Sequence, residues 1–145
     1  MKALASSWQF WAVLSAVFAA LTAILAKIGV ENVSSDFATF FRTIVIMFAF
    51  ALILGVTGQY PAWGTIDNRT YMFLTLSGLA TGASWLCYFR ALKMGDAARV
   101  APVDKLSVVL VAILGVLFLG EKLNILNWLG VAFVGMGAIL VAYRG

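Results

Sequence analysis

The chain alternates between long apolar runs and short polar connections. The apolar runs predict helices at about 8–27, 36–56, 69–89, 100–119 and 125–143. Each run approaches the roughly 20 residues that a helix needs to cross a hydrocarbon core of about 30 Å. The pattern therefore predicts an all-α polytopic membrane protein with five transmembrane helices.

The composition agrees with this class. Hydrophobic residues make up 63% of the 145 positions and charged residues only 11%, which is typical of an integral membrane protein. The formal net charge of +4 is dispersed among the apolar runs, so nucleic acid is not expected as a partner. Because the connections are too short to fold by themselves, we expect a single transmembrane domain over residues 1–145.

The scarcity of histidine and cysteine excludes several kinds of catalytic and metal site. Histidine is absent and Cys87 is the single cysteine. Nucleophilic catalysis by serine–histidine or cysteine–histidine sets is therefore excluded. A zinc or iron site would lack its usual ligands. We expect no enzyme activity, no catalytic residue, no bound metal and no cofactor.

Two of the five spans must draw charged residues into the membrane. The stretches 106–119 and 43–56 each have 14 residues without a charge, which is about 21 Å of helix. Asp104 and Lys105 are therefore predicted about one turn inside the membrane, and Arg42 at a similar depth on the same side. Such charges should face protein or water rather than lipid. All three are candidate substrate-binding residues.

Two interpretations of these charges stay open. Arg42 and Asp104 can pair, because buried charges persist mainly when they have partners. Alternatively, Arg42 reaches the head groups and Asp104 stabilises the positive end of its helix. Lys105 should project about 100° away from Asp104 on a helix. It could then attract an anion, such as a carboxylate or phosphate, or bind lipid head groups.

Aromatic and small residues supply further candidates. Trp85 and Tyr88 lie one turn apart near the end of the third run, where they can line a cavity or anchor the helix at the interface. Gly78 and Gly82 have the spacing of a close helix-packing seam, although a small face can also make room for a solute. Pro102 either occupies the first turn of the fourth helix or kinks it.

A set of positions in the second half of the chain carries a family pattern. It consists of Tyr88, Ala91, Leu92, Ala97, Ala98, Pro102, Gly120, Glu121, Trp128, Gly130, Gly135 and Gly137. The pattern resembles the EamA-type domain of the drug/metabolite transporter superfamily, and the similarity covers the whole chain. Asp104 and Lys105 depart from it, because many relatives are apolar there. Glu121 is a candidate for a gating or folding role, although a glycine turn with a solvated carboxylate also explains it.

The resemblance implies an architecture and a function. Larger members carry two five-helix halves of opposite orientation around a central cavity. A single half needs a second copy, antiparallel or parallel, or a similar five-helix chain. The resemblance therefore implies a secondary transporter that exports a small metabolite or drug-like solute and works as a homodimer by alternating access. A non-transporting membrane subunit and a lipid-linked carrier (a flippase component) are the alternatives.

The lysines and arginines of the connections predict an orientation. The amino-terminal side collects Lys2, Arg69 and Lys122, and the opposite side collects Lys27, Arg90, Lys93, Arg99 and Arg144. This excess favours an amino terminus outside and a carboxyl terminus in the cytoplasm of a bacterial-type inner membrane. Because the excess is modest, mixed insertion stays open.

Overall fold

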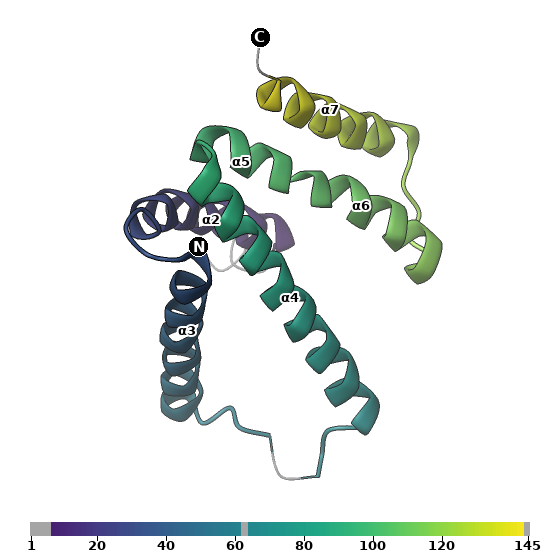
Figure 1. Ribbon diagram of the computed structural model, residues 1–145. Helices are drawn as coiled ribbons and strands as arrows, with labels where there is room; N and C mark the ends of the chain where they lie inside the picture. Colours follow the sequence, from purple (N-terminus) through teal and green to yellow (C-terminus); the bar gives the residue numbers. More distant parts are fainter. Residues whose placement is uncertain (1–6, 62–63, 144–145) are drawn as a thin grey trace. The chain divides into compact units, whose positions relative to one another are not determined.

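A computed structural model describes residues 7–61 and 64–143. Within these residues, five helical segments are long and apolar enough to cross a membrane. They are α2 (Trp8–Gly29), α3 (Ser35–Thr57), α4 (Asn68–Met94), the segment Ala97–Leu119 and α7 (Ile125–Ala142) (Figure 1). The predicted all-α fold with five spans is confirmed. Lys2 and Arg144, which entered the orientation argument, lie outside the described residues.

Side-chain caps explain where two of the helices begin. The Ser34 hydroxyl accepts a hydrogen bond from the backbone N–H of Phe37 at 3.2 Å, and α3 starts at the next residue. Asn124 caps α7 in the same way by accepting from the N–H of Asn127 at 2.8 Å. Both caps satisfy a backbone donor that the first turn of a helix leaves without a partner.

The fourth span is divided into three pieces rather than formed as one helix. They are α5 (Ala97–Asp104), α6 (Leu106–Leu114) and a π-helical turn, η1 (Gly115–Leu119). Pro102 lies inside α5 and not in its first turn. Because proline has no N–H, it weakens the hydrogen-bond ladder just before the interruption at Lys105. Of the two placements predicted for Pro102, the one within the helix is therefore found.

The chain forms two compact units. The α3–α4 unit, residues 26–93, contains the last turn of α2 together with α3 and α4. The α5–α7 unit contains the rest of α2 with α5, α6, η1 and α7, and α7 packs against both α5 and α6. Within the α3–α4 unit, α3 and α4 approach each other where α3 begins and α4 ends, and diverge in the other direction (Figure 1).

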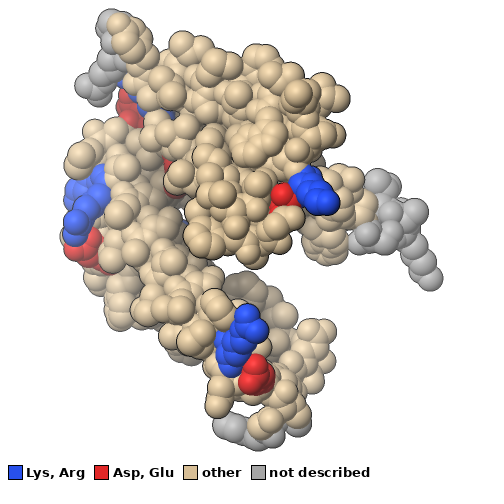
Figure 2. Space-filling view, turned by 90° about the vertical axis from the view of Figure 1, so that its right-hand side faces the viewer, with Lys and Arg blue, Asp and Glu red and all other residues tan. Residues whose placement is uncertain are grey.

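The surface carries few charges. On the face seen in Figure 2, lysines, arginines and carboxylates lie in small groups that are separated by uncharged residues. Most large hydrophobic side chains of the five spans are exposed, as expected for helices that contact lipid or another chain. The charged groups that do occur near helix ends are therefore the natural starting point for a functional site.

Candidate functional site

The candidate site is built around Arg42, which α3 places against the aromatic rings of α4. Arg42 follows the first residue of α3 by about two turns, roughly 10 Å along the axis. Its guanidinium carbon lies 4.4 Å from the centre of the Trp85 ring and 5.4 Å from that of Phe89. Both distances are within the range of attractive cation–π contacts. We call Arg42, Trp85, Tyr88 and Phe89 the arginine–aromatic cluster.

The cluster is partly withdrawn from solvent. Phe89 is only 2% exposed, while Arg42, Trp85 and Tyr88 are half-buried. The Tyr88 ring packs edge-on against the Phe89 ring, with 6.4 Å between their centres. Partial desolvation strengthens the attraction between a cation and an aromatic face. Three predicted site residues are thus brought together on two helices.

Arg42 has no carboxylate partner among the described residues of its own α3–α4 unit. There, Asp36 is paired with Arg90. Among the described residues of this unit, the Arg42 guanidinium also donates no hydrogen bond. A cation–π contact with the indole does not use the N–H groups of the guanidinium as hydrogen-bond donors to a carboxylate or carbonyl oxygen. The cluster is therefore able to bind a group that accepts hydrogen bonds.

Phe89 is not among the site residues predicted from the sequence, although its spacing from Trp85 could have indicated it. It follows Trp85 by four residues, and residues four apart share one face of a helix. The cation–π contact to Arg42 makes use of this spacing. A search for aromatic pairs four residues apart, placed opposite an intramembrane arginine, would have found it.

An ion pair links the same two helices nearer to their ends. Arg90 Nη2 lies 3.2 Å from Asp36 Oδ2 and 3.3 Å from Oδ1. The side chains are 66% and 58% exposed, so the pair is well solvated. The sequence gives no sign of this pair, since its members lie 54 positions apart. It marks the end at which α3 and α4 approach each other.

Reversing the Asp36–Arg90 pair is expected to have only a small effect. Exposed ion pairs contribute up to about 1 kcal/mol, and salt screens them. Asp36→Arg and Arg90→Asp should each lower the unfolding temperature slightly in low salt, and the double variant should recover most of the loss. Thermal unfolding in detergent at low and high salt measures this. A double variant that loses the sum of both single effects would contradict the pairing.

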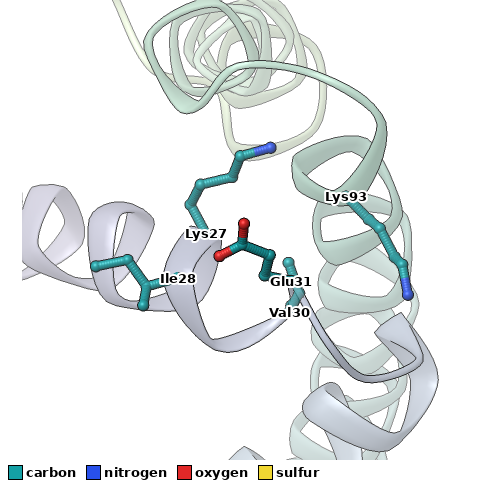
Figure 3. A pocket seen from close by; sticks show the side chains of 5 residues that line it. All are labelled: Lys27, Ile28, Val30, Glu31 and Lys93. Carbon is teal, nitrogen blue, oxygen red and sulfur yellow. The ribbon is translucent and has the colours of Figure 1, made fainter.

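Two lysines tie the end of α4 to the α2–α3 junction. Lys27 Nζ donates to the backbone carbonyl of Leu92 at 2.7 Å, and Lys93 Nζ donates to that of Val33. Both lysines line a pocket of about 360 Å³ with Ile28, Val30 and Glu31 (Figure 3). Figure 3 shows the two ammonium groups pointing in different directions, so they do not converge on one point in the pocket.

Asp104 and Lys105 lie in the α5–α7 unit. Lys105 Nζ is 3.4 Å from Asp104 Oδ2, and the side chains are 54% and 36% exposed. The two residues are neighbours in sequence and lie at the interruption between α5 and α6. Because Arg42 and Asp104 belong to different units, their predicted pairing stays a prediction.

The glycine candidates divide into open and occupied positions. A Cβ built at Gly78 or Gly82 would meet no atom within 4 Å, so neither glycine is in a close packing contact within the described α3–α4 unit. A Cβ at Gly135 would lie 3.3 Å from Val109 Cγ2, which makes Gly135 an intrachain packing position between α7 and α6. The predicted packing role of Gly78 and Gly82 stays a prediction.

Glu121 closes the π-helical turn at the end of the fourth span. Gly120 has a φ of 69°, and the next backbone N–H, that of Glu121, donates to the carbonyl of Gly115 at 3.2 Å. The Glu121 carboxylate folds back onto the turn, since a Cβ built on Gly115 would lie 2.7 Å from its Oε2. Gly120 supplies the left-handed conformation that other residues adopt at a cost. The predicted gating or folding role of Glu121 stays a prediction.

Comparison with known proteins identifies the family to which the chain belongs. The profile of the EamA-like transporter family matches residues 6–143. The chain is 66% identical over 139 residues to an "Uncharacterized transporter in cobO 3'region" of Sinorhizobium sp, covering 96% of this chain and 99% of that protein. No solved structure matches the chain.

Two further relatives differ from the chain in length or coverage. The "Uncharacterized transporter YxxF" of Bacillus subtilis is 26% identical over 148 residues, which are 98% of this chain but only 45% of that protein. A "Probable 4-amino-4-deoxy-L-arabinose-phosphoundecaprenol flippase subunit ArnE" of Yersinia pestis is 30% identical over 77 residues, 53% of this chain and 68% of the relative. With a match that extends over nearly all of its residues, the chain belongs to the EamA-like transporter family.

Proposed function

We propose that the chain is a secondary transporter that exports a small metabolite or drug-like solute. It works by alternating access when two five-helix units pair. The observation that carries this proposal is the arginine–aromatic cluster, in which a half-buried cation lies about two turns inside a membrane span and has no carboxylate partner among the described residues of the α3–α4 unit. Intramembrane charges are costly and commonly mark a solute pathway.

The need for a second unit is supported by length and by open surface. The chain spans less than half of the Bacillus subtilis relative, which has room for a second segment of similar size. Within the described α3–α4 unit, Gly78 and Gly82 are open small-residue positions on α4 that suit close helix packing. The second unit is another copy of this chain, antiparallel or parallel, or a similar chain. The membrane is a bacterial-type inner membrane, with the amino terminus outside.

A second candidate is a lipid-linked carrier. It is favoured by the similarity to a relative that is named as a probable flippase subunit. In this case Arg42 or Lys105 would act on the phosphate of the lipid, since guanidinium and ammonium groups both bind phosphate. A non-transporting membrane subunit is the outcome if neither kind of cargo moves.

Thiol labelling from the two sides of the membrane tests the transporter proposal. Tyr88→Cys in a Cys87→Ala background places a thiol in the cluster, and an impermeant maleimide is added to intact cells or to inverted vesicles. We expect labelling from both sides, because alternating access opens the cluster to each side in turn. Labelling from one side only would contradict transport and favour the subunit.

The matched control is Lys93→Cys, which lies at the end of the same helix. Its thiol should be labelled from a single side if all copies insert in one orientation. If some copies insert the other way, its two-sided labelling gives their fraction. Tyr88→Cys supports transport only when its labelling from the far side exceeds this fraction.

A further inference from the structure

We propose that the arginine–aromatic cluster binds an anionic group, a carboxylate or a phosphate, joined to an apolar or aromatic part of the cargo. This inference rests on the proposed function and names the class of solute. Arg42 would hold the anion, while the rings of Trp85, Tyr88 and Phe89 would accommodate the apolar part.

The geometry favours an anion over any other polar group. The guanidinium has five N–H donors and no acceptor, and they lie in the plane of the group. The guanidinium carbon lies over the Trp85 ring, 4.4 Å from its centre, so the indole restricts where the guanidinium can lie. An edge with two parallel N–H groups matches the two oxygens of a carboxylate or phosphate.

The charge balance of the α3–α4 unit also favours an anionic ligand. A half-buried cation within a membrane span is costly until an opposite charge compensates it. Asp36, the carboxylate nearest to Arg42 along α3, is already paired with Arg90 closer to the helix ends. The cargo can therefore supply the missing negative charge. A cationic solute would instead be repelled by Arg42.

A protein in which Trp85 is the single tryptophan allows binding to be measured at the cluster itself. Trp8, Trp11, Trp63 and Trp128 are replaced by phenylalanine. Trp85 fluorescence is then titrated with four probes of one ring type: para-nitrobenzoate, para-nitrophenyl phosphate, para-nitrobenzylamine and para-nitrobenzyl alcohol. We expect saturable quenching by the two anions and none by the amine or the alcohol. Saturable quenching by the amine would overturn the proposal.

Variants of Arg42 show whether the guanidinium is responsible. Arg42→Gln should weaken anion binding at least about tenfold, a loss of about 1.4 kcal/mol. Arg42→Lys keeps the charge and should bind with intermediate affinity. The control is Arg69→Gln, because Arg69 lies over Phe73 at 5.7 Å near the start of α4 and should leave binding unchanged. Equal affinities for Arg42→Gln and the parent would overturn the proposal.

Two further arms separate the remaining explanations. Anion binding that appears only after Asp104→Asn would show that Asp104 is the ion-pair partner of Arg42, and would overturn the proposal. The titrations are also repeated in nanodiscs of zwitterionic lipid with and without phosphatidic acid. Displacement by this lipid identifies a lipid phosphate as the source of the anion, and no displacement identifies a soluble solute; both results support an anion site.

The two proposals fail in different ways. If the Tyr88→Cys thiol is labelled from both sides but no anion binds, transport stands and the solute class is wrong. If anions bind through Arg42 but labelling occurs from one side only, the anion site stands and transport is wrong. Circular dichroism of each variant confirms that a loss of binding does not come from a loss of helix.

Discussion

Replacing Gly135 by leucine is expected to destabilise the protein by about 1–3 kcal/mol. Gly135 lies on α7, and even a single added carbon would be 3.3 Å from Val109 Cγ2 of α6. The rest of a leucine side chain cannot enter this contact, so α7 must move away from α6 or the side chain must adopt a strained conformation. Thermal unfolding in detergent, followed by circular dichroism, measures the loss.

Two variants test whether the α6–α7 contact is the cause. Gly130→Leu changes the same helix at an exposed position where a Cβ would meet no atom within 4 Å, so it should cost much less. Adding Val109→Ala to Gly135→Leu opens space next to the new side chain and should recover part of the stability. Equal losses for Gly130→Leu and Gly135→Leu would show that leucine harms α7 wherever it is placed.

Replacing Lys27 by methionine is expected to cost about 1–3 kcal/mol. Methionine keeps an unbranched apolar side chain but removes the ammonium group that donates to the Leu92 carbonyl at 2.7 Å. Leu92 is completely buried near the end of α4, so water has poor access to replace the lost donor. Chemical or thermal unfolding in detergent measures the change in stability.

Lys93→Met is the matched control for Lys27→Met. Lys93 also donates to a backbone carbonyl, that of Val33, but this hydrogen bond is exposed. Water can replace an exposed donor, so a loss below about 1 kcal/mol is expected. A loss for Lys93→Met as large as that for Lys27→Met would mean that burial of the carbonyl does not decide the cost.

The five spans could be predicted from the sequence because membrane helices are specified by apolar length. The same argument from apolar length predicts that Arg42 lies inside the membrane, and this depth stays a prediction. The contact between the Arg42 guanidinium on α3 and the Trp85 ring on α4 could not be predicted. It depends on how two helices rotate and cross, and apolar length carries no information about either.

The ends and breaks of the helices were harder to predict. The sequence left two placements of Pro102 open, and the interruption at Lys105 was not foreseen. A single turn of altered backbone changes neither the composition nor the length of an apolar run. The pairing of Asp36 with Arg90 was missed for another reason, because contacts between distant residues require knowledge of the fold.

The contacts made by Lys27, Arg90 and Lys93 have a mechanical consequence. Together they fasten the final turns of α4 to the α2–α3 junction and to the beginning of α3. A rocking motion would therefore carry these segments as one block, and separating them would require three polar contacts to break in concert. Ionic strength would weaken one of the three far more than the others, because only the Asp36–Arg90 contact joins two formal charges.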